Sequence, residues 1–398
     1  MEKLFSFQDN LIKNTKMDFK RYLYDEVSFE NRMLAIKGIR GVGKTTLLLQ
    51  YLKTQNPAKS LYVTADHPWF YTHGLLDTAE EWHKQGGRLL IIDEVHKYVN
   101  WSAELKNIYD GFPDIRVIFT ASSALDIYRG EADLSRRVLS YSLHGLSFRE
   151  YLAINHIHTF QPISLEDIIN NHRQLCLDIL EKVEAPLVYF KKYLRSGYLP
   201  FGTREMNEED YLTRVYQIVD ATLAYDLAFI NDYSAVHQSK IKKLLGILAE
   251  TVPFIPNITE LAATLQVSRN TLLLLLEHLE QGSLINKISK TGRGTSLLQK
   301  PDKIVLENTN FSHALSQQPV EGTLRETFFV NQVRNKGYSV EVAEQGDFLV
   351  KGQYTFEVGG KNKKQKQIKE VENAYLVKDN INSGFGNGIP VWLFGFLY

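Results

Sequence analysis

The chain has 398 residues, and its 46 basic and 46 acidic side chains cancel, so the net charge does not favour a polyanionic partner. Hydrophobic residues make up 44% of the sequence, enough to fill the cores of roughly two or three domains of ~150 residues each. The single cysteine, Cys176, excludes an intrachain disulfide and a cysteine-rich zinc site. No stretch approaches the ~20 apolar residues of a membrane span, and the N-terminus lacks the apolar core of a signal peptide, which predicts a cytoplasmic protein with no membrane partner.

The first motif follows a helical lead-in over residues 1–32. Residues 33–53 predict a buried strand, a glycine-rich turn and a helix in succession. The turn satisfies G-x-x-x-x-G-K-[ST], in which backbone N–H groups wrap phosphates, the lysine reaches the β- and γ-phosphates, and the hydroxyl ligates Mg²⁺. The sequence therefore predicts ATP and Mg²⁺ as ligands. The predicted phosphate cradle consists of Gly38, Gly41, Val42, Gly43, Lys44, Thr45 and Thr46.

A pair of acids follows the third predicted strand. After a second strand over residues 60–66 and a helical segment ending at Gly86-Gly87, four apolar residues directly precede Asp93 and Glu94. This is the form of a Walker B strand, in which the first acid holds Mg²⁺ through water, together with Thr45, and the second polarises the attacking water. The alternative is a buried strand that ends in two solvated acids.

Two further groups of polar residues come next. A fourth strand over residues 116–124 brings Thr120, Ser122 and Ser123 to its tip, where a hydroxyl can bind the γ-phosphate or the attacking water, or else cap the next helix. Arg136 and Arg137 are candidates for an arginine finger, supplied within the chain or by a neighbouring subunit of a homo-oligomer. The alternative for paired arginines is a surface ion pair.

The motifs GIRGVGKTT, LLIIDEVHKY, FTASSALDI, DLSRR and LHGLSFREYL resemble a group of AAA-type ATPases from bacteria and archaea. Their order and spacing match that group over residues 1–155, with Ala121 standing where the group usually has glycine. The resemblance implies an ATP-binding domain over 1–155. It also implies a C-terminal region of unknown function that contains a winged helix and a nuclease-like fold.

The middle of the chain predicts helices. Residues 156–255 carry apolar side chains at helical spacing, with breaks at Gly197 and Pro200, and form a connector or lid. Residues 256–308 predict a winged helix-turn-helix with a wing-like turn at 292–294. A DNA-reading role would place Ser268, Arg269, Asn270 and Thr271 in the groove, with backbone contacts from Lys287, Lys290, Arg293 and Lys300. The leucine-rich body of the second helix favours protein packing instead.

The last segment, 309–398, predicts a separate α/β unit that resembles the PD-(D/E)xK nuclease superfamily. Helices are expected over 322–337 and 366–377, three strands between them, and a final strand over 390–398. The resemblance gives metal-binding roles to Glu326, Asp347 and Glu357. The lysine expected two residues after Glu357 is replaced by Gly359, and the next candidate is Lys361, so we predict little or no metal-dependent cleavage.

Together these patterns predict an α/β P-loop NTPase with a parallel, AAA-like sheet, then a helical and winged-helix region, then a small restriction-nuclease-like α/β domain. The predicted function is an ATPase whose hydrolysis moves or gates the C-terminal domains. Two alternatives stay open. One is a nucleotide-gated signalling switch with slow turnover. The other is an ATP-dependent nucleic-acid processing or defence factor, so the predicted partners include an unidentified nucleic acid or protein.

Overall fold

The structure is a computed structural model that describes residues 1–122, 134, 136–203, 206–227, 235–251, 255–290, 300–364 and 366–398. The chain forms two compact units, unit 1 (Met1–His144) and unit 2 (Gly145–Tyr398). The division comes before the boundary predicted at residue 155, because Phe148 packs against Phe190, Tyr193 and Phe396 of unit 2. The finer domain boundaries, at 255 and 308, stay predictions. No helix in the described residues is both long and apolar enough to cross a membrane.

Unit 1 is built on a sheet of five strands in the order β2-β3-β4-β1-β5, and every neighbouring pair is parallel. The central strands are apolar runs buried on both faces, as parallel sheets require. The carboxyl ends of the strands therefore meet at one edge, which is where such sheets bind ligands. The strands are β1 (Met33–Lys37), β2 (Ser60–Thr64), β3 (Leu89–Asp93), β4 (Arg116–Ala121) and β5 (Leu139–Ser142).

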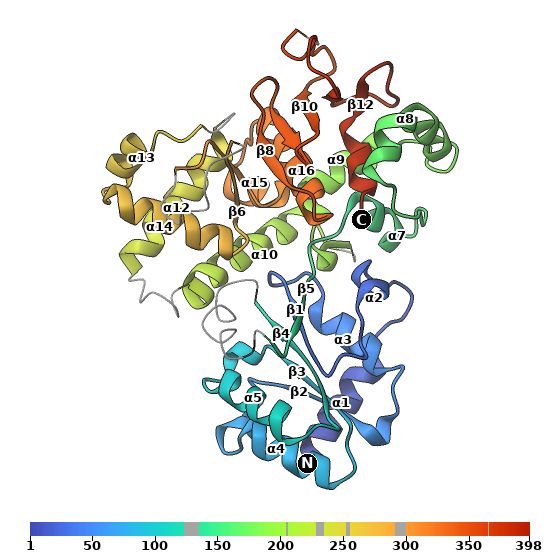
Figure 1. Ribbon diagram of the computed structural model, residues 1–398, viewed down its shortest axis with the longest axis vertical. Helices are drawn as coiled ribbons and strands as arrows, with labels where there is room; N and C mark the ends of the chain where they lie inside the picture. Colours follow the sequence, from blue (N-terminus) through green and yellow to red (C-terminus); the bar gives the residue numbers. More distant parts are fainter. Residues whose placement is uncertain are drawn as a thin grey trace. The chain divides into compact units, whose positions relative to one another are not determined.

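Helices cover this sheet (Figure 1). Leu75, Ala79 and Trp82 of α4 and Leu105 and Ile108 of α5 join the buried cluster formed by one face of the strands. The helices of unit 1 are α1 (Glu2–Asn14), α2 (Leu23–Glu26), α3 (Lys44–Leu52), α4 (Leu75–Lys84) and α5 (Trp101–Gly111), with short 3-10 turns η1 (Pro57–Lys59), η2 (Pro68–Tyr71) and η3 (Val95–Lys97). The helices predicted for residues 1–32 correspond to α1 and α2.

The outer edge of the sheet is closed by a side chain. Gln8 of α1 is buried, its Oε1 accepts from the Tyr62 backbone N–H at 2.6 Å, and its Nε2 donates to the Ser60 carbonyl at 3.5 Å. One amide thus satisfies a donor and an acceptor that the edge strand β2 would otherwise leave unpaired. This contact fixes β2, and with it the side chain of Tyr62.

Unit 2 begins with helices, in agreement with the helical prediction for residues 156–255. Buried residues recur at three- and four-residue spacing, for example Ile168, His172, Cys176 and Ile179 of α8. The elements are α7 (Phe148–Ile154), α8 (Leu165–Leu180), α9 (Pro186–Ser196), η4 (Pro200–Thr203), α10 (Glu208–Ala221), η5 (Thr222–Leu227), α12 (Ala235–Glu250), α13 (Ile258–Leu265), α14 (Arg269–Gln281), α15 (Thr309–Leu315) and α16 (Glu321–Asn335).

The helices α13 and α14 precede an antiparallel pair of strands, β6 (Ile285–Ile288) and β7 (Lys303–Leu306). This order agrees with the helix-turn-helix pattern of the sequence, although its assignment as a winged helix stays a prediction. The predicted wing turn at 292–294 and Arg293 lie outside the described residues. An isolated bridge between Lys290 and Val342 links this part to the C-terminal sheet.

The C-terminal sheet is mixed, in the order β12-β11-β10-β9-β8. Strand β9 pairs antiparallel with β8 and β10, whereas β11 pairs parallel with β10 and β12. Its strands are β8 (Val340–Val342), β9 (Phe348–Val350), β10 (Tyr354–Gly359), β11 (Ala374–Lys378) and β12 (Gly388–Pro390), followed by the 3-10 helix η6 (Val391–Phe396).

Two predictions for this segment are wrong. The helix expected over 366–377 is replaced by turns and by β11, because pairing with β10 and β12 satisfies the backbone of Ala374–Lys378. The final strand expected over 390–398 is mostly the 3-10 helix η6. A short apolar run does not distinguish a strand from a buried helix, and Phe394 and Phe396 pack on aromatic rings from other elements.

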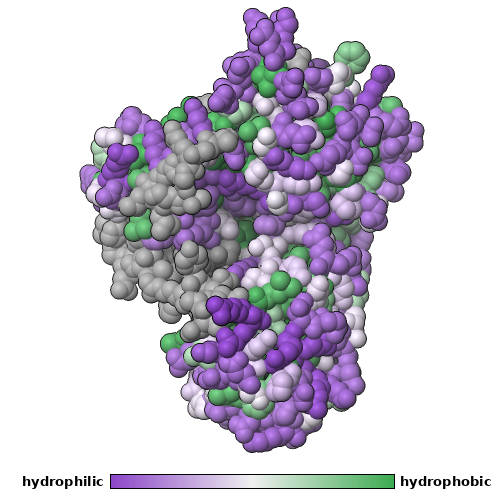
Figure 2. All heavy atoms as spheres, viewed as in Figure 1, coloured by the Kyte–Doolittle hydropathy of each residue, from purple (hydrophilic) through white to green (hydrophobic). Residues whose placement is uncertain are grey.

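The face shown in Figure 2 is mostly hydrophilic, and apolar side chains appear on it in separate small groups. This is expected where the apolar residues fill internal cores.

Candidate nucleotide-binding site

The glycine-rich turn connects β1 to α3 at the carboxyl edge of the sheet of unit 1. Gly41 and Gly43 have φ of 83° and 97°, values that L side chains rarely adopt, so glycine is needed at both positions. Gly38 is needed for a different reason, because a Cβ there would lie 2.3 Å from the carbonyl oxygen of Leu143. The predicted motif glycines are thus explained by the geometry of the turn.

The lysine of the motif lies inside the turn. Lys44 is buried, and its Nζ donates to the carbonyls of Gly38 at 2.6 Å and Ile39 at 3.1 Å. It is also the first residue of α3, whose N-terminal N–H groups have no partners in the helix and whose dipole favours an anion. A turn curled around an ammonium group at a helix N-terminus fits a phosphate group.

Asp93 ends β3 and is held by three hydroxyl groups. Thr45 Oγ1 donates to its Oδ2 at 2.5 Å, Tyr62 donates to the same oxygen at 2.8 Å, and Thr120 donates to Oδ1. The carboxylate is only 3% exposed. Because hydroxyl groups are neutral, they fix its orientation and leave its negative charge uncancelled. Thr45 and Asp93 therefore fit Mg²⁺, which prefers oxygen ligands and keeps some of its waters.

Glu94 follows directly and has a strained backbone. Its φ is 49° and its ψ is 44°, in the left-handed region, and its N–H donates to Thr120 Oγ1 at 2.8 Å and to Asp93 Oδ1 at 3.1 Å. Such conformations persist where the surroundings enforce them, often at functional sites. Burial, and then the charge of Asp93, raise the pKa of the Glu94 carboxyl above its ordinary value.

Two residues that support this site could not be identified from the sequence. Nothing in a strand pattern marks Tyr62 as a partner of Asp93. Arg21 is buried, donates to the carbonyl of Val42 in the glycine-rich turn, and donates to the carbonyl of His144 at 2.8 Å. Arg21 therefore stabilises the backbone of the turn, although it lies in a segment that contains no motif.

The structure does not bring all the predicted residues to this cluster. Ser122 is buried directly after β4, and Ser123 lies outside the described residues. Arg137 donates to both carboxylate oxygens of Asp110 at 3.0 Å, in agreement with the ion-pair alternative for this residue. Arg136 is exposed.

A family model matches the part of the sequence that holds this cluster. Residues 30–152 match a family model described as an AAA domain. This AAA domain contains the glycine-rich turn, Asp93, Glu94 and both arginines. An uncharacterized protein of the archaeon Methanocaldococcus jannaschii is 30% identical over 288 residues, which make up 69% of this chain. The match covers 60% of that protein, so this chain spans less than two thirds of its relative's length.

Two solved structures are also similar to parts of the chain. PCH-2 from C. elegans has 14% identity and a TM-score of 0.24, and covers 38% of this chain and 44% of its own. AMPPCP-bound DnaA from Aquifex aeolicus has 14% identity and a TM-score of 0.24, and covers 70% of this chain and 88% of its own. The fold of the AAA domain is shown by its parallel sheet and its sequence match.

Proposed function

We propose that the AAA domain hydrolyses ATP with Mg²⁺ and that the nucleotide cycle moves or gates unit 2. The observation that carries the proposal is the position of Asp93, whose carboxylate is fixed by Thr45, Tyr62 and Thr120 beside the glycine-rich turn. Phosphoryl transfer requires compensation of charge and an oriented water more than covalent chemistry. These residues supply both requirements.

Each residue has a distinct role in the proposal. The turn from Gly38 to Thr46 binds the phosphates, with Lys44 Nζ leaving its two carbonyl partners for the β- and γ-phosphates. Thr45 and Asp93 hold the metal ion, which would supply charge compensation when bound. Glu94 orients the attacking water and accepts its proton. Thr120 positions both acids, since its hydroxyl contacts the Asp93 side chain and the Glu94 backbone.

The experiment separates binding from hydrolysis. Lys44→Ala is expected to lose nucleotide binding, measured with a fluorescent ATP analogue, whereas Glu94→Gln keeps binding and loses phosphate release. Lys59→Ala, which removes an exposed lysine of the same unit, is the matched control and should keep both. Equal loss of binding in Lys44→Ala and Glu94→Gln would contradict the assigned roles.

The arginine finger stays part of the proposal. Arg136 is the better candidate, because Arg137 is bound to Asp110. If Arg136 acts between subunits of a homo-oligomer, Arg136→Ala mixed with Glu94→Gln should recover part of the hydrolysis at mixed interfaces. A fully active monomer would exclude this version.

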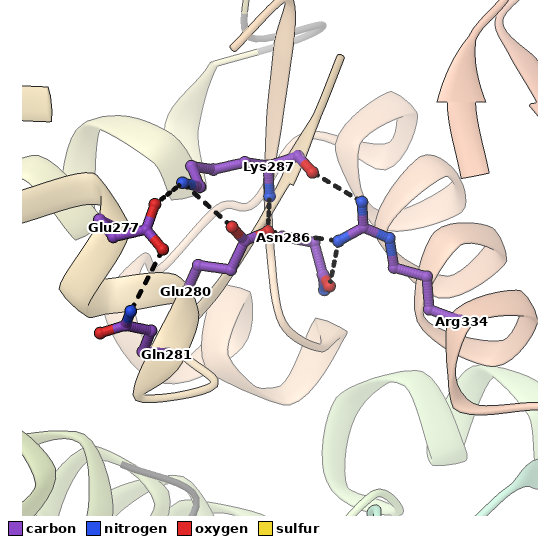
Figure 3. A network of polar contacts seen from close by, with 6 residues as sticks. All are labelled: Glu277, Glu280, Gln281, Asn286, Lys287 and Arg334. Atoms are coloured by element: carbon purple, nitrogen blue, oxygen red, sulfur yellow. Dashed lines mark hydrogen bonds and ion pairs between the residues drawn. The ribbon is translucent and has the colours of Figure 1, made fainter. Parts of the chain in front are cut away.

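In unit 2 we propose that residues 256–308 form a winged helix that serves as an internal docking surface. Its cation Lys287 pairs with Glu277 and with Glu280, the latter at 3.1 Å (Figure 3). Arg334 of α16 donates to the Lys287 carbonyl at 2.6 Å and to Asn286 Oδ1 at 3.0 Å, which ties β6 to the C-terminal region. A lysine engaged by two glutamates is a poor phosphate contact, so this geometry favours docking over DNA reading.

The nucleotide-gated switch is the second candidate. A raised Glu94 pKa leaves less of the carboxyl ionised, and slow turnover would follow if nucleotide binding preserved that shift. Tightly bound ADP that co-purifies with the chain would favour the switch. Rapid turnover stimulated by DNA or RNA would favour the nucleic-acid processing alternative instead.

A further inference from the structure

Unit 2 contains a second group of acids on α16 and the C-terminal sheet, and two of the three are buried. Glu326 lies on α16 and is 8% exposed, Asp347 directly precedes β9, and Glu357 lies on β10 and is fully buried. Asp347 Oδ2 accepts from the Val358 backbone N–H at 2.8 Å, which holds it close to the strand that carries Glu357. We call Glu326, Asp347 and Glu357 the acid cluster.

A lysine from a different part of the unit reaches into this cluster. Lys303, the first residue of β7, is 6% exposed, and its Nζ lies 2.8 Å from Glu326 Oε2 and 3.6 Å from Asp347 Oδ1. The same ammonium lies 4.5 Å from the centre of the Phe348 ring. It therefore has two carboxylates and an aromatic face around it, which is a strong set of partners for a buried cation.

A second lysine binds the third acid. Lys363 Nζ lies 2.8 Å from Glu357 Oε1, and a Cβ added to Gly359 would meet Lys363 Cγ at 2.6 Å. Gly359 stands where the resemblance leads one to expect a lysine, and the side chain of Lys363 fills that space. Lys361, the candidate from the sequence, is exposed. Glycine at 359 is what allows Lys363 to fold back over the strand.

We propose that Lys303 is a built-in cation that takes the place of a divalent metal ion in the acid cluster and fastens β7 to α16 and the C-terminal sheet. The cluster is then an ionic anchor that stays closed to metal ions while Lys303 remains in place. Three carboxylates on a divalent ion would make an ordinary oxygen site. Here two ammonium groups supply the same two positive charges.

Three observations support an anchor. No group of three or more metal-binding side chains in the described residues is arranged to hold a metal ion. The ammonium group of Lys303 bridges carboxylates from two elements, Glu326 on α16 and Asp347 directly before β9. The ion pair joins residues 23 positions apart, on β7 and α16, where the helix-turn-helix part meets the C-terminal region.

The test replaces the lysine and offers a metal. In Lys303→Met, Glu326 and Asp347 lose the lysine that binds them, while Glu357 keeps Lys363. Added Mn²⁺ should therefore bind at least tenfold more tightly than to the wild-type chain, measured by calorimetry, and should raise the thermal unfolding midpoint. Adding Asp347→Asn should remove that response. Lys351→Met, which breaks an exposed ion pair with Glu166 in the same unit, is the matched control and should behave as the wild type does.

Two results overturn the proposal. One is a wild-type chain that binds Mn²⁺ as tightly as Lys303→Met, since Lys303 would then not keep metal out. The other is a folded Lys303→Met that gains no Mn²⁺ binding. If Lys303→Met fails to fold both with and without Mn²⁺, the proposal requires Lys303→Met/Glu326→Gln to fold, because the neutral amide at position 326 needs no positive partner. Failure of both variants to fold would overturn the anchor.

Discussion

The two units bury acids in opposite ways. In unit 1 the partners of Asp93 are the hydroxyl groups of Thr45, Tyr62 and Thr120, which orient the carboxylate and leave its charge intact. In unit 2 the partners of Glu326 and Glu357 are the ammonium groups of Lys303 and Lys363. A carboxylate held by neutral donors keeps its charge and can bind a metal ion, whereas a carboxylate held by an ammonium group is already paired with a cation. The partners of a buried acid therefore indicate its use better than the acid itself.

The largest expected effect comes from removing the charge that the hydroxyl groups of unit 1 preserve. Asp93→Asn keeps the size of the side chain, yet we expect it to lower the ATP hydrolysis rate by about 10²- to 10³-fold, the size of effect seen when one electrostatic contributor is removed from an active site. Phosphate release at saturating ATP and Mg²⁺ measures it. Asp9→Asn, which changes an exposed acid of α1 in the same unit, should keep nearly the full rate. An Asp93→Asn variant with wild-type turnover would refute the comparison.

A third way of holding an acid gives the next largest effect. Glu307 is buried among amides, with Asn286 Nδ2 at 2.7 Å and Asn331 Nδ2 at 3.2 Å, and burial raises the pKa of its carboxyl to about 7 from an ordinary 4.5. Between these two pH values the folded chain holds a proton that the unfolded chain has released. The free energy of unfolding should therefore fall as pH rises from 4.5 to about 7, by about 3 kcal/mol for this group.

Denaturant unfolding at pH 5 and pH 8 measures this effect. Glu307→Gln should show a smaller loss of unfolding free energy across that range than the wild-type chain does. Glu209→Gln changes an exposed glutamate and should reproduce the wild-type loss. An identical pH dependence in Glu307→Gln and the wild type would show that Glu307 is ionised in the folded chain at pH 5.

How far the sequence predicts such sites depends on the separation of the partners. The glycine-rich turn and the Asp93-Glu94 pair are local, so their residues and the parallel sheet around them could be predicted. Tyr62 reaches Asp93 across 31 residues and Lys303 reaches Glu326 across 23, and no local pattern records either contact. The contact of Lys363 with Glu357 cannot be predicted from strand spacing, because the chain folds back after Gly359.

Tyr62 allows a more specific test of the role of the hydroxyl groups around Asp93, with a smaller expected effect on the hydrolysis rate. Tyr62→Phe removes one of the three donors and leaves the ring in the core. A hydrogen bond to a charged group contributes ~1.5 kcal/mol, which corresponds to about a tenfold change in rate. We expect the hydrolysis rate to fall by about that factor and the Mg²⁺ concentration for half-maximal rate to rise, because Asp93 is less well oriented. If Tyr62 had a purely structural role, Tyr62→Phe would lower the thermal unfolding midpoint and leave the Mg²⁺ requirement unchanged. Tyr51→Phe is the control, because Tyr51 is another buried tyrosine of unit 1 and has no recorded contact with Asp93.

The smallest effect is expected where unit 2 would have to read nucleic acid. Arg269 and Asn270 are exposed at the start of α14, but the body of that helix buries Leu272, Leu275 and Leu276. Lys287 is already paired with two glutamates of the same unit, so it is a weak partner for a phosphate group. Arg269→Ala/Asn270→Ala should therefore change the affinity for duplex DNA by less than about twofold.

The matched contrast is Lys364→Ala/Lys366→Ala. It removes two exposed lysines from the basic run after β10, which consists of Lys361, Lys363, Lys364, Lys366 and Lys369. If the chain binds nucleic acid at all, that second variant should weaken binding more and make the affinity less dependent on salt, since each lost phosphate contact releases one counterion fewer. Fluorescence anisotropy at two salt concentrations measures both quantities. A several-fold, salt-dependent loss of DNA affinity in Arg269→Ala/Asn270→Ala alone would instead indicate that α14 reads the DNA groove. Cations of unit 2 would then contact phosphate groups as well as acids of the same unit.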